Sequence, residues 1–209
     1  MGEIILVRHG ETEWSASGRH TGRTDIPLTV QGESRARSAG AALLELRKAG
    51  HRIEAGWSSP AARARRTAEL AGIAIDGTDP DLWEWDYGGY EGLTTAEIQK
   101  DRPGWFLWTD GVVPGGPDGF PGETIEEVGE RCDRVIARVR PLVDPLSPNR
   151  LDGDVALVAH GHYLRVLAAR WLSLPPADGA LFRLDTAAIS RLGFEHDRPV
   201  LTEWNDVPS

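Results

Sequence analysis

The chain opens with a short run dominated by apolar residues, Glu3-Ile4-Ile5-Leu6-Val7, which ends at Arg8-His9-Gly10. A run of this length without polar alternation is typical of a strand that is buried on both faces of a parallel sheet. Ligand sites in such sheets lie outside the carboxyl ends of the strands. We therefore expect Arg8, His9 and Gly10 to lie in a loop beside a binding site.

The order of strand, loop and helix recurs along the chain. The first strand is followed by a helical pattern from Thr29 to Lys48, with Thr29 as its N-cap. A second strand is expected over residues 55–59, with a helix from Ala61 to Ala71, and a third over residues 155–159, with a helical stretch to Leu172. This alternation predicts an α/β fold, a three-layer sandwich with a mostly parallel central sheet.

The composition changes to aromatic residues, glycine and proline between Trp83 and Glu123, with one short helix candidate around residues 94–100. A segment of this kind inside a compact domain is usually functional. We expect a single domain over residues 1–209 with a small loop-rich cap from about residue 83 to residue 122. Helical spacing resumes over residues 123–143, and residues 180–185 and 189–194 alternate like edge strands.

The formal net charge is -9, which argues against nucleic acid as a partner. The single Cys132 cannot form an internal disulfide, so we expect a cytoplasmic location. The N-terminal apolar run is too short for a signal peptide and no run approaches a bilayer span, so we expect no membrane association. Whether the protein forms a homodimer stays an open question. Arginines concentrated at a few loop-like positions suit a small anion as the ligand.

The residues at two strand ends suit phosphate chemistry. Arginine offers a planar fork of donors, glycine lets a backbone approach an anion, and histidine forms covalent phosphoryl intermediates. Taken alone, Arg8-His9-Gly10 is more typical of a hydrogen-bonded turn. His160-Gly161 follows a second strand in the same way, so His9 and His160 are expected to face one ligand. Arg63 adds a cation at a helix start, where free backbone N–H groups also favour anions.

These residues belong to a series of six ordered matches through which the sequence resembles the histidine phosphatase superfamily, which includes cofactor-dependent phosphoglycerate mutases and acid phosphatases. The matches cover nearly the whole chain: Arg8-His9-Gly10-Glu11-Thr12, Thr21-Gly22 before Pro27-Leu28-Thr29, Ser59-Pro60 with Arg63 and Thr67-Ala68, Leu82-Trp83-Glu84 before Tyr87-Gly88, Pro121-Gly122-Glu123-Thr124, and His160-Gly161.

The resemblance implies that His9 is the nucleophile and that Glu84 is the proton donor. It also implies that Arg8, Arg63 and His160 form the phosphate pocket. Phosphoryl transfer requires the same roles. Two arginines and a charged histidine can neutralise the phosphoryl group during its transfer, and a leaving alkoxide needs a proton. Aromatic neighbours of Glu84 are expected to desolvate its carboxyl group and favour the protonated form. The usual fate of a glutamate is a solvated surface position.

The family pattern also predicts substrate contacts, which are Ser15, Thr21, Gly22, Tyr87, Gly161 and His162. Ser15 stands where the family's mutases usually have Asn, and Trp85 stands where they have Arg. Residues 101–122 offer only Arg102, whereas the mutases carry paired arginines. A mutase must retain a bisphosphate intermediate, so these differences favour hydrolysis. The segment from Glu84 to Gly92 is similar to the sugar-bisphosphatase and broad acid phosphatase branch.

We therefore expect a phosphomonoesterase for small phosphorylated metabolites, with sugar phosphates preferred. The alternatives are a phosphoglycerate mutase and a non-catalytic module that binds phosphorylated ligands. A metal site built from His162, His9 and Asp86 is a further alternative, but no metal-ligand spacing supports it, so we expect no metal and no cofactor. Arg65 and Arg66 are expected to be solvated charges. Trp105, Phe106 and Trp108 are more typical of packing residues in the cap than of ligand contacts.

Overall fold

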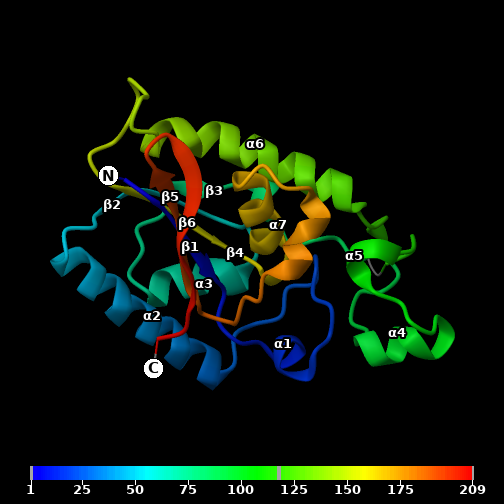
Figure 1. Cartoon of the computed structure of the whole chain (residues 1–209). Coiled ribbons are helices and arrows are strands. Elements are labelled where there is room, and N and C mark those ends of the chain that lie inside the picture. The colour runs from blue at the N-terminus through cyan, green and yellow to red at the C-terminus, as the bar shows by residue number, and fades with distance from the viewer. Residues whose placement is uncertain (1, 117–118, 209) are drawn as a thin grey trace.

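A computed structural model describes residues 2–116 and 119–208 of the chain. Its centre is a six-stranded sheet with the order β3-β2-β4-β1-β5-β6 (Figure 1). The strands are β1 (Ile4–Arg8), β2 (Ile53–Ser58), β3 (Gly77–Thr78), β4 (Asp154–Ala159), β5 (Ile189–Glu195) and β6 (Arg198–Asp206). β1, β2, β3 and β4 run parallel, whereas β5 pairs antiparallel with both β1 and β6. The expected mostly parallel sheet is confirmed.

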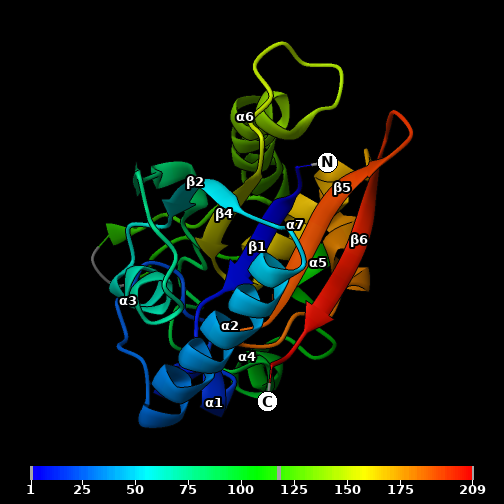
Figure 2. The same ribbon diagram turned by 90° about the vertical axis from the view of Figure 1, so that its left-hand side faces the viewer.

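Two layers of helices cover the sheet. The helices α2 (Val30–Lys48) and α3 (Ala62–Leu70) lie on one face, and α6 (Ile125–Val143) and α7 (Gly161–Trp171) lie on the other (Figures 1 and 2). β1 contributes side chains to the cores beneath both helix layers, because successive side chains of a strand point to opposite faces of the sheet. Ile5 and Val7 join the core beneath α2 and α3, while Ile4 and Leu6 join the core beneath α6 and α7. The expected three-layer sandwich is therefore confirmed.

The central pair of strands fixes where the site lies. β1 and β4 are parallel neighbours, and their last residues, Arg8 and Ala159, are paired in the ladder. His9 and His160 are the next residues of each strand, so the sheet register places them side by side. The N–H of His9 extends the ladder by donating to the carbonyl of Ala159 at 2.9 Å.

Local signals in the sequence set the starts of the long helices. Thr29 caps α2 by accepting a hydrogen bond from the N–H of Gly32, as its position predicted. α6 begins with a capping box formed by Thr124 and Glu127. None of the helices within residues 2–116 and 119–208 combines the length and apolar character that a membrane span requires.

The cap segment, residues 83–122, carries the short helices α4 (Thr95–Asp101) and α5 (Leu107–Asp110), which extend to one end of the molecule (Figure 1). Its aromatic residues are mostly packing residues. Trp105 and Trp108 are buried in the same core cluster as Leu6, whereas Phe106 is half exposed. The remaining short elements are α1 (Glu13–Ser17) and the 3-10 helices η1 (Pro80–Leu82) and η3 (Pro176–Leu181).

The C-terminal expectation was partly wrong. Residues 180–185 do not form a strand, because Pro176 opens the 3-10 helix η3, which ends at Leu181. β5 covers the expected residues 189–194, but it lies inside the sheet. The edge strands are β3 and β6, and neither was predicted from the sequence. The residues of β6 do not alternate clearly between buried and exposed, because an edge strand leaves much of both faces open to solvent.

Candidate active site

His9 lies at the carboxyl end of β1 and is almost fully buried. Its Nδ1 lies 2.7 Å from the carbonyl oxygen of Gly10. Because a carbonyl oxygen only accepts hydrogen bonds, Nδ1 carries the proton and Nε2 keeps its lone pair. Burial, and then the positive charges of Arg63 and Arg8, hold the pKa of His9 well below its ordinary value. The imidazole is therefore neutral, with Nε2 as its nucleophilic atom.

His160 occupies the equivalent position after β4, and its ring centroid lies 5.1 Å from that of His9. Its Nε2 lies 2.7 Å from the hydroxyl of Ser59, the residue that follows β2. Its Nδ1 is buried and has no hydrogen-bond partner among the described residues. Burial, followed by the charges of Arg63, His9 and Arg8, lowers the pKa of His160 well below its ordinary value. The protein without a ligand therefore favours the neutral form of His160 and not the expected charged form.

Two arginines flank the histidine pair, and each has an unsatisfied Nε. Arg63, in the first turn of α3, is fully buried and donates to the carbonyls of Gly22 and Thr24, both at 2.8 Å. Arg8 donates from Nη1 to the carbonyl of Leu184. In both arginines Nε is buried without a partner in the described part of the chain. Three buried nitrogens beside His9, counting Nδ1 of His160, thus lack hydrogen bonds.

Unsatisfied buried nitrogens are rare and costly, and an oxyanion is a ligand that accepts hydrogen bonds from such nitrogens when they carry a proton. Gly161 helps by its size, because a Cβ at this position would lie 3.1 Å from the guanidinium of Arg8. Gly10 has a different role from the expected one, which was to let the backbone approach the anion. Its N–H donates to Thr67 at 2.9 Å and is not free for an anion. A Cβ on Gly10 would lie 2.5 Å from the carbonyl oxygen of Gly32, so the glycine permits close packing against α2.

Glu84 is almost fully buried and lies at the N-terminus of α7. Its Oε1 accepts the N–H groups of Trp85 and Tyr163 at 2.9 and 2.8 Å, and its Oε2 accepts that of His162 at 3.1 Å. The expected surface position is thus excluded, and the expected desolvation is present. The three N–H donors fix the orientation of the carboxyl group.

An ion pair between Arg131 and Glu123, which was not expected from the sequence, holds the Glu84 segment in place. Arg131 of α6 makes two hydrogen bonds to Glu123, at 2.7 and 2.9 Å. It also donates to the carbonyls of Asp81, Trp83 and Glu84. Glu123 lies in the motif Pro121-Gly122-Glu123-Thr124, and this motif is the feature of the sequence that could have indicated a role for Glu123. Arg131 had no signal because it looks like one more arginine on a charged helix.

A cavity of about 260 Å³ opens beside His9. Eight predicted site residues line it, namely Arg8, His9, Ser15, Thr21, Glu84, Tyr87, Gly161 and His162. Arg63, His160 and Gly22 are not among the lining residues, and the N–H of Gly22 donates to Glu91 at 2.9 Å. The lining is completed by residues that were not predicted, namely Gly18, Arg19, His20, Thr95, Arg165 and Leu184.

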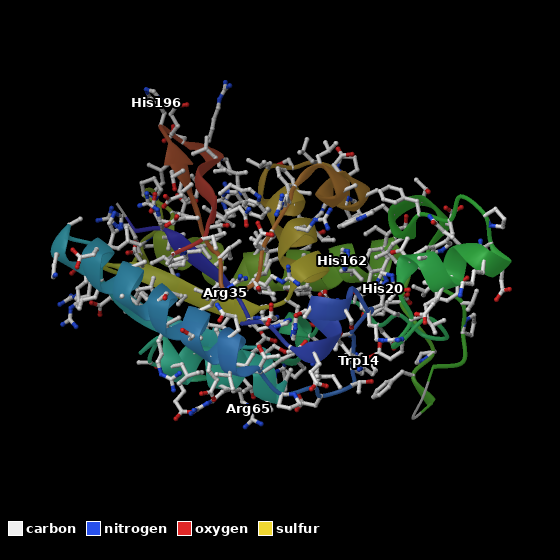
Figure 3. All side chains as sticks on the ribbon, turned by 90° about the horizontal axis from the view of Figure 1, so that it is seen from below. Trp14, His20, Arg35, Arg65, His162 and His196 are labelled. Carbon is white, nitrogen blue, oxygen red and sulfur yellow. The ribbon has the colours of Figure 1, made fainter. Side chains whose placement is uncertain are left out.

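Tyr87 and His162 form the polar wall of the cavity, with 2.6 Å between the hydroxyl and Nδ1. His162 and His20 lie near each other, whereas Arg65 points outward into solvent, as expected (Figure 3). Arg66 is partly exposed and pairs with Glu33 and Glu69, so it has no place in the site. Across residues 2–116 and 119–208, no three His, Cys, Asp or Glu side chains are grouped as metal ligands.

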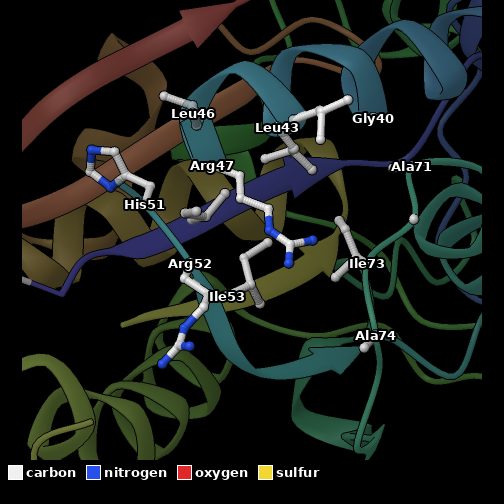
Figure 4. A pocket seen from close by; sticks show the side chains of 13 residues that line it. Gly40, Leu43, Leu46, Arg47, His51, Arg52, Ile53, Ala71, Ile73 and Ala74 are labelled. Carbon is white, nitrogen blue, oxygen red and sulfur yellow. The ribbon is translucent and has the colours of Figure 1, made fainter. Parts of the chain in front are cut away.

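A second cavity, of about 470 Å³, lies far from these residues along α2 (Figure 4). It is lined mainly by apolar side chains, among them Leu43, Leu46, Ile53 and Ile73, with Arg47 reaching across it. None of the predicted site residues contributes to it.

Comparison with known proteins identifies the family of the chain. The family model of the histidine phosphatase superfamily (branch 1) matches residues 4–207. An acid phosphatase of Mycobacterium tuberculosis is 40% identical over 92% of this chain and 87% of its own length. A sedoheptulose 1,7-bisphosphatase of Saccharomyces cerevisiae is 38% identical over 81% of this chain and 67% of its own. A probable phosphoglycerate mutase of Salmonella paratyphi C is 32% identical over 97% of this chain and 89% of its own.

The fold has a solved counterpart. A crystal structure of the product of the open reading frame Rv3214 from Mycobacterium tuberculosis superposes with a TM-score of 0.85 at 38% identity, and the match covers 100% of this chain and 99% of that one. The chain therefore belongs to branch 1 of the histidine phosphatase superfamily and is a phosphatase with the phosphoglycerate mutase-like fold.

Proposed function

We propose that this phosphatase hydrolyses small phosphomonoesters, with sugar phosphates preferred, through a phosphohistidine at His9. The observation that carries the proposal is the set of three buried, unpartnered nitrogens around His9: Nε of Arg8, Nε of Arg63 and Nδ1 of His160. A bound phosphoryl group would accept hydrogen bonds from all three, which supports these residues as the phosphate pocket.

The first step transfers the phosphoryl group to the protein. Nε2 of His9 attacks phosphorus, the bond from phosphorus to the ester oxygen breaks, and the leaving oxygen takes a proton from Glu84. Negative charge brought in by the phosphate favours protonation of His160, which offsets the lowered pKa of this residue in the protein alone.

The second step releases inorganic phosphate. A water molecule gives a proton to the Glu84 carboxylate as its oxygen attacks phosphorus. The bond from phosphorus to Nε2 then breaks, which restores neutral His9 and protonated Glu84. Both steps use donors that are already in place in the protein.

The alternatives make different demands on the cavity. Trp85, at the position where the mutases carry an arginine, is fully buried, and its Nε1 donates to the carbonyl of Glu123. It therefore offers no cation to a bisphosphate intermediate, which favours hydrolysis over mutase chemistry. A non-catalytic module would have no use for a nucleophile beside an acid.

The test is a rapid alkaline quench with a substrate labelled at the phosphate. Labelled phosphohistidine is expected on the unaltered protein and absent from His9→Ala. The matched control is His196→Ala, because His196 lies on the exposed β5–β6 turn and makes no contact with the site. Primed isomerisation of 3-phosphoglycerate with little phosphate release would replace this proposal with the mutase. Tight phosphate binding without turnover would replace it with the binding module.

We further propose a cytoplasmic location, which the buried free thiol of Cys132 supports. Cell fractionation tests it. The homodimer stays a prediction that light scattering can check.

A further inference from the structure

His160 can donate a hydrogen bond to a phosphate only if its Nδ1 carries a proton. Burial lowers the pKa of His160, so in the ligand-free protein the ring is neutral and holds one proton, on Nδ1 or on Nε2. Nδ1 is buried without a partner in the described part of the chain, whereas Nε2 lies 2.7 Å from the hydroxyl of Ser59. The hydrogen bonds of Ser59 therefore decide which nitrogen carries the proton.

The hydroxyl of Ser59 has two hydrogen-bond partners among the described residues. Its Oγ accepts the N–H of Ala61 at 3.3 Å and faces Nε2 of His160. A serine hydroxyl also has one proton to donate, and Nε2 of His160 is the acceptor available to it within residues 2–116 and 119–208. When the hydroxyl donates to Nε2, this nitrogen keeps its lone pair and Nδ1 carries the proton.

The opposite tautomer of His160 leaves more polar atoms unsatisfied. With the proton on Nε2, the hydroxyl proton of Ser59 would have no acceptor among the described residues, and the lone pair of Nδ1 would have no donor there. With the proton on Nδ1, only that N–H lacks a partner, and a bound phosphate would accept from it. Because each unpartnered buried polar atom is unfavourable, the Nδ1–H tautomer is preferred.

The sheet holds Ser59 in place. Ser59 directly follows β2, as His160 follows β4 and His9 follows β1, and β4 lies between the other two strands. The N–H of Ser59 donates to the carbonyl of Val158 at 2.9 Å, which extends the ladder between β2 and β4. Ser59 is also fully buried, so bulk water does not compete for its hydroxyl. The hydroxyl is therefore a fixed donor.

The two histidines then present opposite nitrogens of the same tautomer. The carbonyl of Gly10 holds Nδ1–H of His9, which leaves the lone pair of Nε2 as the nucleophile. Ser59 holds Nε2 of His160, which leaves Nδ1–H as a donor. When a phosphate protonates His160, the hydroxyl of Ser59 can turn and accept the N–H of Nε2, so Nδ1 is a donor in both forms.

We propose that Ser59 is a positioning residue of the phosphatase reaction, whose hydroxyl holds His160 in the Nδ1–H tautomer, so that this donor is ready before the substrate binds. The inference rests on the proposed function, because it requires that His160 contacts the phosphate. It adds a residue that does not itself touch the phosphate, and it assigns the proton of a pocket residue.

The first measurement determines the tautomer. Nitrogen-15 NMR spectra of protein labelled at its six histidines distinguish a ring nitrogen that carries a proton from one that does not. The signals of His160 are identified by their absence from His160→Gln. We expect the proton on Nδ1 in the ligand-free, unaltered protein. This result decides the proposal even if a Ser59 variant does not fold.

Variants of Ser59 test whether its hydroxyl selects the tautomer. In Ser59→Ala we expect a measurable population with the proton on Nε2, and in Ser59→Thr, which keeps a hydroxyl, we expect Nδ1–H to persist. The matched control is Ser190→Ala, because Ser190 is equally buried but its hydroxyl accepts the N–H of Asn205 at 3.0 Å. This control should leave the spectrum of His160 unchanged.

Kinetics connect the tautomer to the reaction. Ser59→Ala should lower kcat for a sugar phosphate about tenfold, the effect of one hydrogen bond, and Ser190→Ala less than about twofold. Because Ser59 acts through His160, adding Ser59→Ala to His160→Ala should lower kcat by less than about another twofold. Full additivity of the two changes would overturn the positioning role and show that Ser59 only supports the fold.

The outcomes separate the two proposals. A proton on Nε2 of His160 in the unaltered protein, or an Nδ1–H tautomer that persists in Ser59→Ala, would show that the inference is wrong and leave the phosphatase proposal intact. If the tautomer shifts as expected but the unaltered protein releases no phosphate from small phosphomonoesters, the proposed function fails, while the control of the tautomer by Ser59 stands.

Discussion

The imidazole rings of His9 and His160 lie 5.1 Å apart at an interplanar angle of 64°, each directly beyond the end of a central strand. Because the strands are hydrogen-bonded neighbours, the distance between the rings is set by the sheet and not by a flexible loop. A ligand between the rings would meet groups that need no rearrangement.

His160→Ala should lower kcat by about 100-fold to 1000-fold, the usual effect of removing one preorganised donor to a transition state. Phosphate release from a sugar phosphate measures the change. Circular dichroism must show that the variant is folded, because His160 is fully buried and contacts Ser59. Near-normal turnover in a folded variant would remove His160 from the phosphate pocket.

Glu84→Gln should slow the hydrolysis of a sugar phosphate about 100-fold or more, since its alkoxide leaving group needs a proton. An activated aryl phosphate, whose leaving group is stable without a proton, should lose less than about tenfold. Steady-state rates on the two substrates give the comparison. A parallel loss on both would assign Glu84 to the support of α7, where it accepts the N–H groups of His162 and Tyr163.

Acid should destabilise the fold through His20. Burial lowers the pKa of His20 to about 4, against 6.5 for the ordinary side chain. Between these pH values the unfolded chain binds a proton that the folded chain does not. The stability contributed by neutral His20 is therefore complete above pH 6.5 and is lost as the pH falls toward 4, by about 3 kcal/mol in all.

Urea unfolding at about pH 7 and about pH 5 measures this loss. His9, His160 and His162 act in the same direction, because burial also lowers their pKa values. His20→Gln should therefore reduce the loss without abolishing it. An unchanged loss in this variant would show that His20 is not the group concerned.

Arg131→Lys should reduce kcat more than it changes KM. Lysine keeps a charge beside Glu123 but cannot reproduce the fork that also reaches the carbonyls of Asp81, Trp83 and Glu84. The Glu84 segment should then lose its exact placement. Arg134→Lys on the exposed face of α6 is the control, and equal effects of the two changes on kcat would contradict the positioning role.

Chelation should leave the hydrolysis rate within about twofold, because arginines and histidines supply the charge that a divalent ion supplies in kinases. Rates before and after EDTA treatment and dialysis test this. A large loss that one added divalent ion restores would place a metal in the site.

The sequence predicted the parallel core because its signals are local. Ile4 to Val7 is apolar at every position, and Thr29 caps the helix that follows the strand-end loop. β6 escaped prediction because an edge strand is not sorted into a buried and a solvated face. The antiparallel pairing of β5 with β1 also has no local signal, since it depends on where the chain returns after α7.

For the site, the sequence identified residues by type and position but not by the direction of their polar atoms. Arg63 was expected in the phosphate pocket, yet its Nη atoms bind backbone carbonyls and only Nε remains free. Arg165 was missed because an arginine inside an apolar helix carries no motif. Its place in the lining of the cavity becomes visible only when the chain has folded.

The contact between Gly10 and Gly32 has a consequence for protein engineering. The loop that carries His9 rests on α2 through backbone atoms, with no room for a methyl group on either glycine. The position of His9 therefore does not depend on which side chains the outer face of α2 carries. Charge and solubility can be redesigned along that face, for example at the exposed Val30 and Leu44, without moving His9, provided that both glycines are kept.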